Sequence, residues 1–216
     1  MAVAGSVRRL KQSMGLKSTM TERGTRPLTI VAVFAGSLAI GLALMMWLLD
    51  GPRGAMAPAA IGGPFQLLDQ SGATVTADRL QGKPTLLFFG YTHCPDICPT
   101  TLFDVSEVLK AMGKDADGVN AYFVSVDPER DSPAIMKDYL SSFDPHLKAL
   151  TGDPEAVAKM LTEYRVYAKK VPGKDGDYTM DHSAMVYLMD RNGHFVAPFK
   201  LDRKPEEAAA DLKHYI

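Results

Sequence analysis

The sequence is poor in cysteine, with only two among its 216 residues. A closed structural zinc site usually takes four protein ligands and is rich in cysteine, so this class of site is excluded. The chain also has no internal repeat and no low-complexity tract. Apolar residues make up 46% of the chain and charged residues 23%, which is typical of a folded protein and not of a disordered chain or a coiled coil.

Basic charge is scarce after the first 27 residues. Six of the 24 Lys and Arg residues precede residue 28, but only one of the 25 Asp and Glu residues does so. Residues 50–216 therefore hold 18 basic and 24 acidic residues, a net charge of −6. Proteins bind nucleic acid mainly through cationic side chains, so we expect no nucleic-acid partner for this acidic region.

Charge is absent altogether from one apolar run of 22 residues, Leu28 to Leu49. As a helix rising about 1.5 Å per residue, this run is long enough to cross a hydrocarbon core of about 30 Å, and it predicts a transmembrane helix. The basic residues before it predict a cytoplasmic N-terminus and place the rest of the chain outside the cytoplasm. The alternative is a cleaved signal peptide with a cleavage site near Ala55-Met56-Ala57, but the apolar core of such peptides is usually only about 7 to 15 residues.

The remaining sequence predicts a linker and one domain. Residues 51–64 are rich in Gly, Pro and Ala without apolar periodicity, which is typical of a flexible spacer. The predicted organisation is therefore a cytoplasmic basic segment (1–27), a transmembrane anchor (28–49), a linker (50–64) and a folded domain (65–216).

Within the domain, short apolar runs alternate with segments of helical periodicity. Strands are expected at 85–91 and 121–126, and helices at 99–112, 132–142 and 153–164. Ser132-Pro133 and Asp153-Pro154 are N-cap and first-turn signals for the last two of these helices. A polar loop then ends at Asp181-His182-Ser183. Apolar runs at 184–189 and 194–199 flank Asn192-Gly193, a strong hairpin signal, and a final helix is expected from Pro205 to Tyr215. This order predicts an α/β fold with a central mixed sheet flanked by helices, the layout of a thioredoxin-like domain.

Both cysteines lie in Cys94-Pro95-Asp96-Ile97-Cys98-Pro99, where a strand is expected to end and a helix to begin. The free N–H groups and positive dipole of a helix N-terminus are expected to lower the pKa of a thiol placed there. Such a pair can close as a disulfide in an oxidising compartment or can bind a thiophilic metal. Thioredoxin-type enzymes place two residues between their cysteines, and the three present here favour a metal, with Cu(I) suited to two thiolates and an imidazole.

Five histidines compete for the third ligand position: His93, His146, His182, His194 and His214. His182 is favoured because it lies at the start of an expected strand, near the mouth of the fold. His93 is next to Cys94, but adjacent side chains usually point in different directions, so its ring is expected to face water. A hydrogen-bonded or surface role is the commoner one for any single histidine, so this alternative stays open.

A second polar cluster, Asp127 to Asp131, follows the strand expected at 121–126. Its carboxylates allow an acid/base or calcium site. The favoured interpretation is a turn followed by a helix cap, in which Asp131 or Ser132 accepts from the first turn of the helix.

Three separated motifs resemble those of the Sco/SenC family, and the resemblance spans roughly residues 60–216. They are Phe89-Gly90-Tyr91-Thr92-His93-Cys94-Pro95-Asp96-Ile97-Cys98-Pro99, Ser125-Val126-Asp127-Pro128-Glu129-Arg130-Asp131 and Asp177-Tyr178-Thr179-Met180-Asp181-His182-Ser183. Members of this family are membrane-anchored copper chaperones with a thioredoxin fold that help to assemble the dinuclear copper centre of cytochrome c oxidase subunit II.

The resemblance implies that Cys94, Cys98 and His182 bind copper. It further implies a single-pass protein of the inner (cell) membrane with a periplasmic domain, or the mitochondrial equivalent, with subunit II or a copper donor or acceptor protein as partner. The alternative function is that of a membrane-tethered thiol-disulfide reductase with Cys94 and Cys98 as its redox pair. A peroxiredoxin-like peroxidase ranks last, because it needs a cysteine in a different loop.

Overall fold

The computed structural model describes residues 26–49, 60–174 and 176–216. The chain divides into two compact units, residues 1–56 and 57–216. The predicted basic segment lies almost entirely outside the described residues, as does most of the predicted linker. The predicted domain boundaries therefore stay predictions.

Helix α1 (Arg26–Leu49) covers the long apolar run of the first unit. Among residues 26–49, 60–174 and 176–216, no helix meets the combined requirement of length and apolarity for crossing a membrane. The transmembrane helix is thus unconfirmed and stays a prediction.

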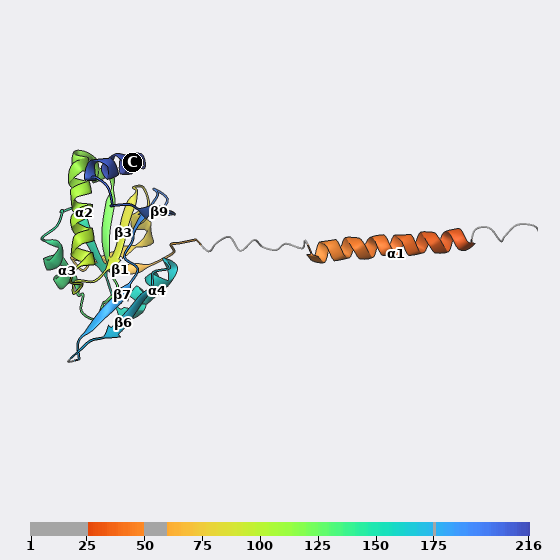
Figure 1. The fold of residues 1–216 in the computed structure, drawn as a ribbon, viewed down its shortest axis with the longest axis horizontal. Helices are drawn as coiled ribbons and strands as arrows, with labels where there is room; N and C mark the ends of the chain where they lie inside the picture. Colours follow the sequence, from red (N-terminus) through yellow and green to blue (C-terminus); the bar gives the residue numbers. More distant parts are fainter. Residues whose placement is uncertain (1–25, 50–59, 175) are drawn as a thin grey trace, which may run out of the picture. The chain divides into compact units, whose positions relative to one another are not determined.

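A seven-stranded mixed sheet forms the centre of the second unit (Figure 1). Its middle consists of three parallel strands, β3 (Thr85–Gly90), β4 (Asn120–Ser125) and β5 (Leu147–Thr151). The antiparallel strands β1 (Gln66–Asp69) and β2 (Thr74–Thr76) extend the sheet beyond β5. On the other edge, the antiparallel strands β8 (Val186–Met189) and β9 (Phe195–Phe199) extend it beyond β3. The predicted mixed sheet is confirmed.

Aromatic side chains on the two faces of the sheet show how helices cover it. Phe88 and Phe123 stack on one face, where Tyr139 of helix α3 (Pro133–Leu140) contacts Phe123. Phe89 points to the opposite face and contacts Tyr164, which follows helix α4 (Pro154–Glu163). The helices are α2 (Ile97–Met112), α3 (Pro133–Leu140), α4 (Pro154–Glu163) and α5 (Pro205–Lys213), with two short 3-10 helices, η1 (Ala77–Leu80) and η2 (Gly113–Gly118).

Several local predictions are confirmed by side-chain and backbone geometry. Ser132 and Asp153 cap α3 and α4 by accepting from the backbone N–H groups of Ile135 and Ala156. The β8–β9 hairpin turns at Asn192-Gly193, and Gly193 has a φ of 77°, which suits glycine.

The polar stretch before His182 was predicted as a loop, and this prediction is wrong. Strands β6 (Ala168–Pro172) and β7 (Tyr178–His182) form a separate two-stranded hairpin that projects from the domain (Figure 1). Most side chains of these strands are exposed. Strand β6 is mostly exposed and its sequence lacks the alternation of apolar and polar residues that signals a strand. Strand β7 does alternate, with Met180 packed against the core, but over only five residues.

Candidate metal centre

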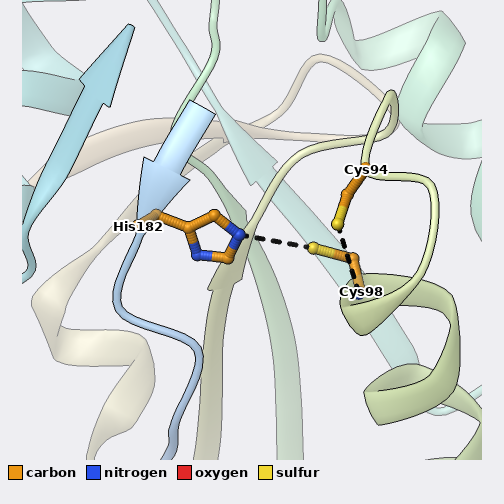
Figure 2. A group of neighbouring side chains, drawn as sticks. All are labelled: Cys94, Cys98 and His182. Carbon is orange, nitrogen blue, oxygen red and sulfur yellow. Dashed lines mark hydrogen bonds between the residues drawn. The ribbon is translucent and has the colours of Figure 1, made fainter. Parts of the chain in front are cut away.

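Three side chains from three different segments converge at one end of the sheet. Cys94 lies in the loop after β3, Cys98 in the first turn of α2 and His182 at the end of β7 (Figure 2). Their ligand atoms all lie within 4.8 Å of one another. Among the described residues, this is the only group of three or more His, Cys, Asp or Glu side chains close enough to hold one ion.

The start of α2 brings the two cysteines together. Asp96 precedes the helix but does not cap it with its side chain. Instead, the backbone N–H of Cys98 points at the Sγ of Cys94, at 3.4 Å. A sulfur atom thus takes the place that a capping oxygen usually holds at a helix N-terminus.

Gly90 provides the space for the Cys98 sulfur. A Cβ atom at this position would lie 2.6 Å from the Cys98 Sγ and 2.7 Å from the Phe123 ring. Both distances are far below van der Waals contact, so no larger residue fits without displacing one of these groups. The last residue of β3 therefore fixes how closely the sulfur approaches the sheet.

Burial dominates the electrostatics of Cys98. Its side chain is fully buried, and desolvation is the main reason why the pKa of the thiol is raised well above its usual value. The prediction that the helix dipole lowers the thiol pKa is therefore wrong for this cysteine. A raised pKa favours the neutral thiol, so a metal that binds Cys98 would have to displace its proton.

His182 presents one ring nitrogen to the cysteines. Its Nδ1 lies 3.1 Å from the carbonyl oxygen of Ser183, and its Nε2 lies 3.7 Å from the Cys98 Sγ. A carbonyl oxygen only accepts, so the contact with Ser183 favours the proton on Nδ1 and leaves the Nε2 lone pair directed at the sulfur (Figure 2). The Tyr91 ring packs nearly perpendicular to the imidazole, with 5.7 Å between centroids.

The other histidines do not join this group. His93 is exposed, as expected, and its Nδ1 lies 3.1 Å from the hydroxyl of Thr92. The ring of His146 contacts Asp144 and Asp117, and that of His194 contacts Asp190. The structure therefore brings together the three residues that the sequence favoured and places His93 outside the group.

The carboxylates of the 127–131 segment (Asp127 to Asp131) form hydrogen bonds and ion pairs with other parts of the domain. None of them belongs to the group formed by Cys94, Cys98 and His182. Ser132 caps α3, while the buried Asp131 accepts from the backbone N–H and hydroxyl of Thr92. Burial raises the pKa of Asp131. The structure favours the turn and helix cap over an acid/base or calcium site. The sequence did not predict the hydrogen bonds between Asp131 and Thr92 of the cysteine loop, because no sequence pattern pairs these distant residues.

Comparisons with known proteins agree on one group of relatives. A family model described as SCO1/SenC matches residues 53–216. This chain is 74% identical in sequence to Bradyrhizobium japonicum ScoI, whose structure is known with copper bound. The match covers 73% of this chain and 100% of that chain, with a TM-score of 0.72. Yeast Sco1 with copper bound is 36% identical over 72% of this chain and 88% of that chain, with a TM-score of 0.66. A SCO2-like protein of Rickettsia felis is 39% identical over 155 residues, which are 71% of this chain and 76% of that protein.

Proposed function

This chain belongs to the SCO1/SenC family, and we propose that it is a metallochaperone that binds one copper ion through Cys94, Cys98 and His182. The observation that carries the proposal is the convergence of these three ligand atoms within 4.8 Å. Solved relatives with copper bound, from Bradyrhizobium japonicum and yeast, support the choice of metal.

The chemistry of the donor set supports copper independently of these relatives. Two thiolates and one neutral imidazole suit Cu(I), which prefers soft ligands and accepts three of them. Zinc in a structural site usually requires a fourth protein ligand, and no further His, Cys, Asp or Glu within the described residues joins this group. In this proposal copper is the cargo that the protein transfers, and it is not a catalytic cofactor.

Access to the site suits ligand exchange with a partner. Cys94 is 9% exposed and His182 is half-buried, whereas Cys98 is fully buried. An incoming thiolate or imidazole can therefore reach the metal on the side of Cys94 and His182 while Cys98 still holds it. The proposed acceptor is the dinuclear copper centre of cytochrome c oxidase subunit II, which the family resemblance implies.

The direct test is a titration of the reduced protein with Cu(I), followed by transfer to a copper-free subunit II domain. We expect one copper per chain, loss of tight binding in Cys94→Ser, Cys98→Ser and His182→Ala, and transfer to the acceptor. His93→Ala is the matched control, because its ring lies beside the site without joining it, and it should bind like the wild type. Unchanged affinity in His182→Ala would contradict the three-ligand site.

The alternative function, a thiol-disulfide reductase, requires a reactive thiolate. Burial raises the pKa of the Cys98 thiol, which disfavours this residue as the attacking group. Turnover of a disulfide substrate by the copper-free protein, with no copper bound by the wild type, would favour the reductase over the metallochaperone.

We further propose that the first unit anchors the protein in the inner membrane with the C-terminal domain in the periplasm. The large apolar side chains of α1 are exposed, among them Phe34, Leu38 and Leu42, and burial in lipid would remove them from water. Protease treatment of spheroplasts tests this placement. The expected result is digestion of the domain from outside the cell, and protection of the domain would contradict it.

A further inference from the structure

The β6–β7 hairpin carries His182 but has no backbone pairing with the main sheet. Its two strands pair only with each other, whereas the cysteine loop follows directly from β3 in the centre of the seven-stranded sheet. A two-stranded hairpin alone is at best marginally stable in water. The position of His182 relative to the cysteines must therefore depend on side-chain contacts between the hairpin and the body of the domain.

Arg130 makes the central contacts of this kind. Its Nη1 donates to the carbonyl oxygen of Tyr178 at 3.0 Å and to the carboxylate of Asp177 at 3.2 Å. Its guanidinium carbon also lies 3.7 Å from the centroid of the Tyr178 ring. Both partners belong to the hairpin, Tyr178 as the first residue of β7.

Asp127, in the body of the domain, binds both Arg130 and the hairpin residue Tyr178. Its carboxylate accepts from the Arg130 Nε at 2.5 Å and from the Tyr178 hydroxyl at 2.9 Å. The side chains of Arg130 and Asp127 are 17% and 2% exposed, so the pair is largely withdrawn from water. Loss of one partner would leave a charge unpaired in a buried place, which makes the contact costly to break.

The same segment also holds the cysteine loop. Asp131 accepts from the Thr92 hydroxyl at 2.6 Å and from the Ser125 hydroxyl at 2.7 Å, and Thr92 precedes Cys94 by two residues. The guanidinium of Arg130 lies 5.7 Å from the centre of the Tyr91 ring, and this ring packs against the imidazole of His182. The 127–131 segment therefore contacts both parts of the metal site, although it supplies no ligand.

We propose that Arg130 is a positioning residue for copper binding, which acts by holding the His182 hairpin against the cysteine loop. This inference rests on the proposed copper site. Without Arg130 the hairpin occupies a wider range of positions. Binding of the His182 imidazole to copper must then also fix the hairpin in one position, and this cost lowers the affinity for copper. Removing groups that orient metal ligands typically lowers metal affinity by about 10- to 100-fold, and we expect a loss in this range for Arg130→Met.

A double-mutant cycle on the full-length reduced protein tests this role. Cu(I) affinity is measured for the wild type, Arg130→Met, His182→Ala and the double variant, with folding checked by circular dichroism. Arg130→Met should weaken binding by at least about tenfold when His182 is present and by less than about twofold when it is absent, because contacting groups couple and independent ones add. Arg130→Lys should not restore affinity, because its single ammonium cannot form the same fork of hydrogen bonds.

Tyr178→Phe and Lys170→Met keep the proposal testable if Arg130→Met does not fold. Tyr178→Phe removes only the hydroxyl that donates to Asp127, and it should weaken copper binding in the same His182-dependent way. Lys170 also ties the hairpin to the body, through an exposed ion pair with Glu129, and its Nζ lies 4.2 Å from the centroid of the Tyr178 ring. Exposed interactions of this kind contribute little, so Lys170→Met should have little effect.

The outcomes separate the inference from the proposed function. Equal losses with and without His182 would overturn the positioning role of Arg130, as would wild-type affinity in Arg130→Met or in Tyr178→Phe. Failure of the wild type to bind copper would overturn the proposed function itself. The nitrogen splitting in the electron paramagnetic resonance spectrum of the Cu(II) form gives a second readout. It should be altered in Arg130→Met and unchanged in Lys170→Met.

Discussion

At the residue scale, Cys98 is a proposed metal ligand whose burial favours the protonated thiol in the absence of metal. It lies at a helix N-terminus, which favours a thiolate, but it is fully buried and the burial dominates its pKa. The contact between its Sγ and the Nε2 of His182 gives the thiol an acceptor in the metal-free state. The proposed site therefore exchanges a proton for a copper ion at this sulfur.

The raised pKa of Cys98 predicts a pH dependence of copper binding. The thiol is protonated at pH values below its raised pKa, so binding must release this proton and affinity must increase with pH. From about pH 6 to about pH 8, the apparent Cu(I) affinity should increase by up to about tenfold per pH unit for each thiol proton displaced. Competition with a chelator of known affinity at each pH measures this dependence, and an affinity independent of pH would contradict it.

Gly90 yields a second prediction at this scale. Gly90→Ala would push a methyl group into the Cys98 sulfur and the Phe123 ring. We expect the free energy of unfolding to fall by about 1–3 kcal/mol and copper affinity to decrease, because a close-packed core resists added volume. Denaturant unfolding and a Cu(I) titration measure the two effects. Gly41→Ala, which meets no atom within 4 Å, is the matched control, and equal behaviour of the two variants would contradict this account.

At the element scale, what could be predicted depended on what each element buries. Strands β3 and β8 are buried along their whole length, and their apolar runs predicted them. The helices that begin after Ser132 and Asp153 were predicted by capping residues and an adjacent proline. The β6–β7 hairpin was missed because its apolar alternation is confined to the five residues of β7, and because contacts from Arg130 and Asp127, distant in the sequence, help to hold it. His182 could thus be predicted at a strand end, but the element that carries it could not.

The cap of α4 provides a prediction that is independent of copper. The Asp153 carboxylate accepts from the backbone N–H of Ala156 at 2.9 Å. Asp153→Ala should therefore lower the free energy of unfolding by about 0.5–2 kcal/mol, while Asp153→Ser, which keeps a capping oxygen, should restore most of it. Chemical denaturation measures both variants. Copper stoichiometry should not change, since the helix supplies no ligand, and a loss of copper in Asp153→Ala would contradict this separation.

At the scale of the whole molecule, the proposed metal site lies where the end of the β6–β7 hairpin approaches the cysteine loop that follows β3. The sequence motifs indicated the three proposed ligands through a family resemblance, and the mixed sheet was predicted from the order of strands and helices. The 127–131 segment could not be assigned its role in the same way, because a turn and helix cap account for its residues equally well. Only its contacts with both Thr92 and Tyr178 show that it joins the two halves of the site.

The most direct test of the central claim is X-ray absorption spectroscopy of the reduced full-length protein loaded with one equivalent of Cu(I). The account predicts a copper ion bound by two sulfur atoms and one imidazole nitrogen, with the imidazole contribution lost in His182→Ala and retained in His93→Ala. A copper site bound by sulfur alone in the wild type, or one whose spectrum does not change in His182→Ala, would contradict the claim that Cys94, Cys98 and His182 form one copper centre.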